Sequence, residues 1–117
     1  IVINGYPGAI AQVITNLVMN SLKHGYHQGD KGQITIDISK NNTMVRILFK
    51  DDGVGMDEQT LSKIYEPFFT TNRSGGGTGL GLSVVYSIIT QQYQGTIKCT
   101  SKLGKGTTFK IDIKENV

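Results

Sequence analysis

Alternating apolar residues in two pairs of segments constrain the fold of this chain more than any other feature of the sequence. Residues 33–40 (QITIDISK) and 43–50 (TMVRILFK) place an apolar residue at every second position, and two asparagines can turn the chain between them. Residues 96–101 and 107–114 form a second pair around a glycine-rich turn. Because period-two alternation is typical of strands with one buried face, the sequence predicts two β-hairpins.

Two other segments have the spacing of amphipathic helices. Residues 8–24 place their apolar side chains on one helical face, and residues 79–93 repeat this pattern. Between them, Asp57 can cap a short helix that ends near Tyr65. Antiparallel hairpins with helices on one face of the sheet predict an α+β fold, a two-layer α/β sandwich.

Composition limits the class of protein. The 117 residues suffice for one domain, expected over 1–117, and the net charge of +3 includes no basic run of the kind that binds nucleic acid. The single cysteine, Cys99, excludes a disulfide framework and a zinc-ligand set. No apolar run approaches the roughly 18 residues of a membrane span. We therefore expect a cytoplasmic domain without direct membrane contact, although the full-length protein can be membrane-anchored elsewhere.

A polar stripe lies opposite the apolar face of the first helix. Asn16, Asn20 and Lys23 stand at positions i, i+4 and i+7 and so share one face. An amide oxygen suits Mg²⁺, and a lysine can pair with a phosphate. The alternative interpretation is an ordinary solvated face.

An acidic, glycine-rich loop, Asp51-Asp52-Gly53-Val54-Gly55, directly follows a strand. A carboxylate at a strand end can accept a hydrogen bond from an exocyclic amine, and the glycines let a flat ring approach the backbone. A plain hairpin turn is the alternative.

A second glycine-rich segment, residues 75–82 (GGGTGLGL), opens the second long helix. Free amides at a helix N-terminus attract phosphate. The segment lacks the lysine of a Walker A motif and the preceding strand of a dinucleotide fingerprint. A flexible surface loop is the alternative.

An aromatic segment, Tyr65-Glu66-Pro67-Phe68-Phe69, lies between the two glycine-rich loops. Its adjacent phenylalanines indicate either a movable flap over a site or simple anchoring of a loop.

Taken in order, these segments resemble the motifs of one family. NLVMNSLKHG resembles the N box, DDGVGM and GGTGLGL two glycine boxes, YEPFFTT the phenylalanine box and GKGTTF the last box of the catalytic domain of sensor histidine kinases. That domain belongs to the superfamily of DNA gyrase, Hsp90 and MutL. The resemblance implies a Bergerat-type ATP-binding fold with a mixed, mostly antiparallel sheet covered by helices on one face.

The resemblance also implies residue roles and cofactors, ATP and Mg²⁺. Asn20 would coordinate the metal with Asn16 nearby, Lys23 would touch a phosphate, and these three form the catalytic set. Asp51 would accept from the adenine amine, supported by Thr107. The implied ATP-binding residues are His24, Asp51, Gly53, Gly55, Met56, Arg73, Gly77, Thr78, Gly79, Leu80, Gly81, Leu82 and Thr107.

Three departures from the family pattern stand out. Tyr93-Gln94-Gly95 replaces a histidine and two glycines at the end of the second long helix. The first strand of the family's sheet is expected to be missing. Neither His24 nor His27 resembles a phosphoacceptor histidine, which would lie on a dimerisation helix.

The resulting functional hypothesis is a protein-histidine kinase domain. It would bind Mg-ATP and transfer the γ-phosphate to a histidine on a separate dimerisation domain, with a response regulator receiver domain downstream. The alternatives are an ATP hydrolase of the same superfamily, a non-enzymatic binding module and a related protein-serine kinase. Against the hydrolase, Asn16 stands where the superfamily's ATPases have a glutamate, and an amide cannot act as a general base.

Overall fold

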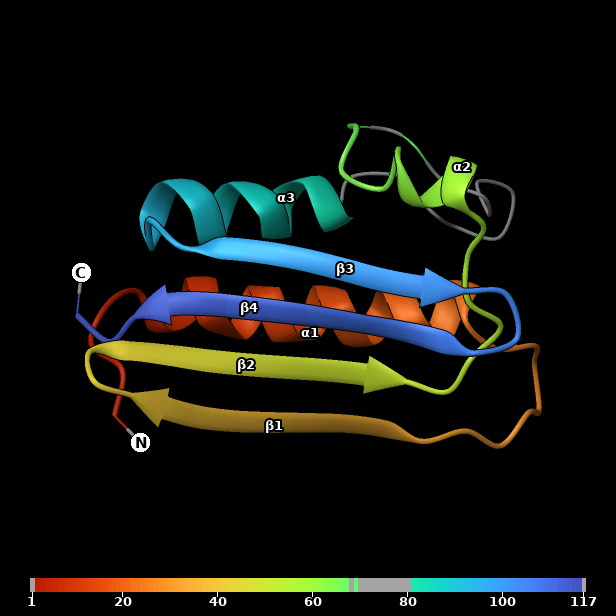
Figure 1. Cartoon of the computed structure of the whole chain (residues 1–117), viewed down its shortest axis with the longest axis horizontal. Coiled ribbons are helices and arrows are strands. Elements are labelled where there is room, and N and C mark those ends of the chain that lie inside the picture. The colour runs from red at the N-terminus through yellow and green to blue at the C-terminus, as the bar shows by residue number, and fades with distance from the viewer. Residues whose placement is uncertain (1, 68, 70–80, 117) are drawn as a thin grey trace.

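A four-stranded antiparallel sheet forms one of two layers in the computed structural model, which describes residues 2–67, 69 and 81–116 (Figure 1). The strands are β1 (Ile34–Asn41), β2 (Met44–Asp51), β3 (Thr96–Lys102) and β4 (Gly106–Lys114), in the spatial order β1-β2-β4-β3. Both expected hairpins are present, and β2 pairs with β4 between them. Among the described residues, parallel pairing is limited to an isolated bridge between Asn4 and Asn116.

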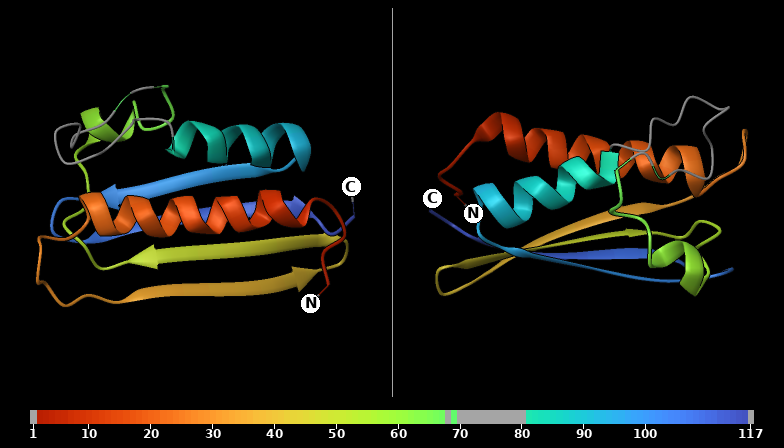
Figure 2. Two further views of the ribbon diagram at one scale, coloured as in Figure 1. Left: turned by 180° about the vertical axis from the view of Figure 1, so that it is seen from behind. Right: turned by 90° about the horizontal axis from the view of Figure 1, so that it is seen from above.

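Two helices, α1 (Pro7–His24) and α3 (Gly81–Ser87), form the second layer on one face of the sheet (Figure 2). Pro7 stands in the first turn of α1, where a missing N–H leaves no helical hydrogen bond unmade. The last part of the predicted second helix is not α-helical, because α3 continues as a π-helical turn, η1 (Ile88–Gln92).

The short helix α2 (Glu58–Leu61) follows the predicted cap residue. The Asp57 carboxylate accepts a hydrogen bond from the Thr60 backbone N–H at 2.7 Å, which satisfies one of the free donors of the first turn. None of the helices in the described part of the chain combines the length and the apolar character that a membrane-spanning helix requires.

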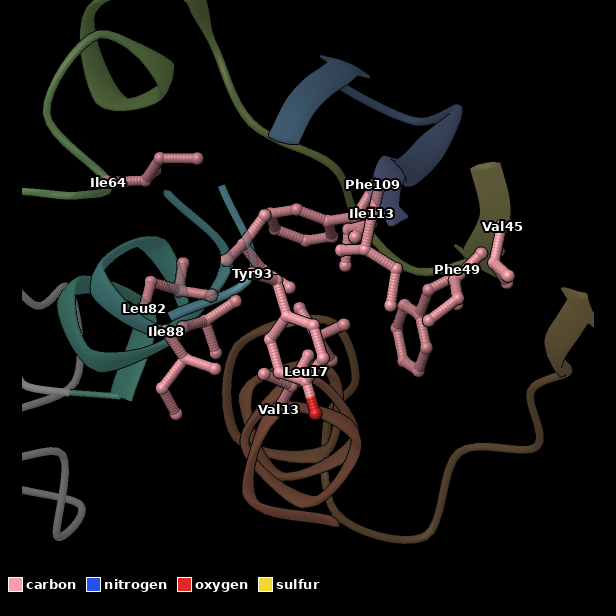
Figure 3. Close-up of a cluster of buried hydrophobic side chains, with 14 residues drawn as sticks. Val13, Leu17, Val45, Phe49, Ile64, Leu82, Ile88, Tyr93, Phe109 and Ile113 are labelled. Carbon is pink, nitrogen blue, oxygen red and sulfur yellow. The ribbon is translucent and has the colours of Figure 1, made fainter. Parts of the chain in front are cut away.

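The hydrophobic core lies between the two layers (Figure 3). The strands supply it from alternate positions and the helices from positions three and four residues apart, as the sequence patterns predict. Its fully buried members include Val13, Leu17, Val45, Ile47, Phe49, Val85, Ile89, Phe109, Ile111 and Ile113.

The apolar face of β1 is less buried than the alternation of residues 33–40 suggests. Ile36 is 39 % exposed and Ile38 is 49 % exposed. The reason is the position of β1, which is an outer strand and, among the described strands, pairs with β2 alone. The two helices cover β2, β4 and β3 more completely than this edge (Figure 1).

The end of η1 is tied to the start of α1 by a buried tyrosine. The Tyr93 hydroxyl accepts a hydrogen bond from the Tyr6 N–H at 3.0 Å and donates one to the Tyr6 carbonyl at 3.2 Å. The two rings meet edge to face. The next residue, Gln94, has a φ of 50°, so the chain turns here with a non-glycine residue in the left-handed region.

Removing the Tyr93 hydroxyl should weaken this tie. We expect Tyr93→Phe to lower the free energy of unfolding by about 1 kcal/mol, because two backbone groups of Tyr6 lose their partner. Tyr86→Phe is the control, since the Tyr86 side chain is 44 % exposed and this change should stay within about 0.5 kcal/mol of the unaltered chain. Urea denaturation measures both, and equal effects would contradict the assignment.

Candidate functional site

A polar residue ends the buried face of β2, and another ends that of α1. Asp51 follows Phe49 by two positions and therefore points toward the helices. Ser21 follows Leu17 by four positions and therefore points toward the sheet, where it is 1 % exposed. Because α1 and β2 finish at the same end of the molecule (Figure 1), the two polar side chains meet where the apolar core stops.

The Asp51 carboxylate is held by three hydrogen bonds. Its Oδ1 accepts from the backbone N–H of Gly53 at 3.0 Å and from that of Thr107 at 3.2 Å. Its Oδ2 accepts from the Ser21 hydroxyl at 2.7 Å. Since each carboxylate oxygen offers about two acceptor positions, Oδ1 is saturated. Among the described residues, nothing else donates to Oδ2, which keeps one acceptor position.

The motifs of the sequence do not indicate Ser21, because it lies on the buried face of α1 and not in the polar stripe. The available signal was a small hydroxyl residue that continues the series Val13, Leu17 at helical spacing. A hydroxyl on a buried face needs a hydrogen-bond partner. The pattern thus indicates a partner on the sheet but does not identify Asp51.

A second serine, Ser101, was also missed and supports the same region from β3. Its hydroxyl accepts from the Met56 N–H at 2.8 Å and donates to the Gly106 carbonyl at 3.0 Å. It also lies 2.8 Å from the Thr107 hydroxyl. Ser101 therefore joins the loop after β2 to the start of β4, the strand that donates to Asp51.

The two glycines of the loop after β2 are required by the chain's own packing. A Cβ on Gly53 would lie 2.4 Å from the Gly25 carbonyl oxygen, which accepts from the Val54 N–H at 2.8 Å. Gly55 has a φ of 74°, and a Cβ there would lie 2.0 Å from the Lys102 carbonyl oxygen. The loop thus lies directly against the end of α1 and against the β3–β4 hairpin.

The first residue of the polar stripe of α1, Asn16, contacts the start of α3. Asn16 donates its side-chain N–H to the carbonyl of Gly81, the first residue of α3, at 3.3 Å. Asn20 is half-buried and makes no side-chain hydrogen bond with another described residue. Lys23 is exposed in the last turn of the helix. Among the described residues, no donor therefore occupies the amide oxygen of Asn20.

His24 ends α1 and is half-buried. Burial lowers the pKa of its imidazole below 6.5, and the positive charge of the neighbouring Lys23 lowers this pKa further. The imidazole is therefore neutral at neutral pH, which suits contact with an uncharged ring.

Of the remaining predicted ligand residues, two lie at the start of α3 and the others lie outside the described residues. Leu82 is 9 % exposed and packs into the core, so only its backbone can face a ligand, whereas Gly81 is half-buried. The other predicted ligand residues lie outside the described residues: Arg73, Gly77, Thr78, Gly79 and Leu80.

The described part of this site offers hydrogen-bonding groups and no reactive acid–base cluster. It supplies one free carboxylate acceptor, neutral amides and a lysine. In residues 2–67, 69 and 81–116, no three His, Cys, Asp or Glu side chains gather as a metal-binding group. A cation at the Asn20 amide would therefore need oxygen ligands from water or from a bound anion.

Comparison with known proteins adds a family match and similar structures. A family model described as histidine kinase-, DNA gyrase B-, and HSP90-like ATPase matches residues 5–117. Sporulation kinase A of Bacillus subtilis (strain 168) is 40 % identical over 111 residues, which cover 95 % of this chain but only 17 % of that kinase.

Two solved structures give the spatial likeness. The catalytic domain of histidine kinase ThkA matches with a TM-score of 0.80 at 32 % identity, over 97 % of this chain and 71 % of that chain. ThkA in complex with the response regulator protein TrrA matches with a TM-score of 0.70 at 32 % identity. This match covers 92 % of this chain and 28 % of that chain.

Loss of the Ser21 hydroxyl should destabilise this end of the core. We expect Ser21→Ala to lower the free energy of unfolding by about 1–3 kcal/mol. The Asp51 carboxylate loses a hydrogen-bond donor, and the methyl group of alanine cannot replace it. Ser39→Ala on exposed β1 is the matched control and should change little. Chemical denaturation compares the two, and an effect of Ser21→Ala no larger than the control would refute the bond's importance.

Proposed function

The chain belongs to the family of histidine kinase-, DNA gyrase B- and HSP90-like ATPases, and we propose that it is the catalytic domain of a protein-histidine kinase. In this proposal it binds Mg-ATP and transfers the γ-phosphate to a histidine on a separate dimerisation domain. The observation that carries it is the Asp51 carboxylate, which three hydrogen bonds fix and whose Oδ2 has one acceptor position that no described residue uses.

At the base end, Asp51 Oδ2 accepts a hydrogen bond from the exocyclic amine of adenine. Gly53, Gly55 and Met56 line the ring, and the neutral imidazole of His24 lies against the base or ribose. Thr107 supports Asp51 through its backbone N–H. GTP carries a carbonyl oxygen where ATP carries the amine, so two acceptors would face each other and GTP would bind poorly.

At the phosphate end, Mg²⁺ enters with the nucleotide as part of the substrate. Asn20 would supply an amide oxygen to this ion, and water and phosphate would supply the other ligands, as is usual for Mg²⁺. Lys23 and Arg73 pair with phosphate oxygens, and the backbone amides of residues 77–82 hold the phosphates near the start of α3. Held there, the ion would supply neutralisation of the charge on the transferring phosphoryl group.

Transfer to a histidine is favoured over hydrolysis by the side chain at position 16. The Asn16 amide cannot accept a proton near neutral pH and already donates to Gly81. A neutral imidazole is itself a good nucleophile and needs less activation than water. The domain's contribution is thus to position the phosphoryl group and neutralise its charge.

The proposed partners are two protein domains. One is the dimerisation domain that carries the phosphoacceptor histidine, and the other is the receiver domain of a response regulator. The likeness to ThkA, which has been crystallised with the response regulator TrrA, supports the second partner. Because ATP is a cytoplasmic metabolite, we propose that the domain lies in the cytoplasm. The proposal includes neither a nucleic-acid partner nor direct membrane contact by this domain.

Base selection provides one test. We expect tighter binding of ATP than of GTP, and Asp51→Asn should weaken ATP binding by about one to three kcal/mol, because the amine loses a charged acceptor. Isothermal titration calorimetry measures both affinities. Asp37→Asn, on exposed β1, is the control and should leave ATP binding unchanged. Equal affinity of the unaltered chain for ATP and GTP would rule out this role of Asp51.

The reaction provides a second test. We expect the chain alone to bind Mg-ATP, hydrolyse it negligibly and leave itself unlabelled, but to label a histidine of its matching dimerisation domain. Asn20→Ala should abolish this transfer and leave the fold intact. Asn41→Ala, at an exposed position of β1, is the control and should leave the transfer unchanged. Phosphate release and acid-labile labelling are the measurements. Steady multiple-turnover hydrolysis by the chain alone, abolished by Asn20→Ala, would identify it as a hydrolase instead.

A further inference from the structure

Tyr26 connects three segments of the chain beside the proposed base site. It follows Gly25, the C-cap residue of α1. Its hydroxyl donates to Asp52 Oδ1 at 2.6 Å and accepts from the Asp52 backbone N–H at 3.1 Å. The same Oδ1 accepts from the Gln33 N–H, just before β1, at 2.8 Å. Tyr26, Asp52 and Gln33 together form the Tyr26 clamp.

The tyrosine ring packs against the loop that precedes β1. A Cβ on Gly32 would lie 2.2 Å from the ring's Cε1 atom, so the loop between α1 and β1 passes directly over the ring. The ring and the hydroxyl therefore fix the end of α1, the start of β1 and the end of β2 relative to one another.

The clamp acts next to the residue proposed to select the base. Asp52 is the immediate neighbour of Asp51, and the following residues are held by the bond from Val54 N–H to the Gly25 carbonyl. Thr107 and Ser21 hold the Asp51 side chain from β4 and α1. The backbone next to Asp51 is held on the side of β1, because Asp52 is hydrogen-bonded to Tyr26 and to Gln33.

The clamp keeps one protonation state over the neutral range. Burial and the hydrogen bond to Asp52 raise the pKa of Tyr26 to about 12. The Gln33 N–H and the Tyr26 hydroxyl lower the pKa of Asp52. A neutral phenol therefore donates to a carboxylate, and the short distance is typical of such charge-assisted bonds.

We propose that Tyr26 is a positioning residue for base selection: by holding Asp52, it keeps Oδ2 of Asp51 aligned with the exocyclic amine of the bound base. This inference rests on the proposed function, in which Asp51 accepts that amine. A clamp that served folding alone would affect all nucleotides equally. A clamp that aligns Oδ2 affects only nucleotides that carry the amine.

The test compares ATP with purine riboside triphosphate, which lacks the amine. We expect the unaltered chain to prefer ATP. Tyr26→Phe keeps the ring but removes the hydroxyl, and it should weaken ATP binding about three- to tenfold, as expected for one misaligned hydrogen bond. Binding of the analogue should stay within about twofold, so that the preference shrinks. Tyr86→Phe is the matched control and should change neither affinity.

A pair of substitutions at Asp52 provides the conservative rescue. The amide oxygen that Asp52→Asn introduces can still accept from Tyr26 and Gln33, so ATP should bind nearly as in the unaltered chain. Asp52→Ala removes the acceptor and should reproduce the selective loss seen with Tyr26→Phe. If Tyr26→Phe does not fold, the comparison of Asp52→Asn with Asp52→Ala tests the same proposal.

Each outcome of the calorimetric titrations decides a different question. An unaltered chain that binds both nucleotides equally would overturn the role of Asp51 and, with it, that of Tyr26. If the unaltered chain prefers ATP, an equal loss for both nucleotides in Tyr26→Phe, or no loss for either, would overturn only the role of Tyr26. A loss confined to ATP, reproduced by Asp52→Ala and spared by Asp52→Asn, is the expected result.

Discussion

The antiparallel pairing of β2 with β4 is the interaction on which the rest of the structure depends. Its register sets Phe49 opposite Phe109 in the core and Asp51 opposite Thr107 at the end of the ladder. Asp51 therefore occupies the place where the alternation would put another apolar residue. A slip of one residue would turn the apolar side chains of β2 to solvent and separate Asp51 from its Thr107 donor. Burial of the core thus stabilises the geometry of the proposed base site.

The site is formed where the apolar patterns of two layers end. Ser21 continues the buried stripe of α1 as Asp51 continues that of β2, and the hydrogen bond between them ends the core with a satisfied polar pair. A carboxylate in such a place is stable only when its acceptor positions are nearly all used. Among the described residues, one acceptor position on Oδ2 has no donor, so a ligand can use this position without displacing a hydrogen bond of the protein. Tyr26 and Ser101 hold the surrounding loops from opposite sides.

Sequence patterns predicted the elements well but their surroundings less well. The strands and the first helix lie within about two residues of their expected bounds, since periodicity depends only on local spacing. Asp51 was indicated by its place at the end of a strand, whereas Met56 and Thr107 came from motif resemblance alone. Thr107 donates to Asp51, and Ser101 links Thr107 to Met56. Ser21, Ser101 and Tyr26 were missed because each acts through a partner in another element. The exposure of Ile36 was also missed, since alternation does not tell an outer strand from an inner one.

By itself, the sequence determined the α+β class, the order of the elements and the family, because hydrophobic periods and motif order are properties of neighbouring residues. Only the tertiary structure decided which oxygen of Asp51 has an acceptor position that no described residue uses, and which groups hold the carboxylate. Those facts depend on contacts such as that between Ser21 and Asp51, 30 residues apart, and that between Tyr26 and Asp52, 26 apart. Distances across such separations are set by the packing of helix on sheet, which no local pattern contains.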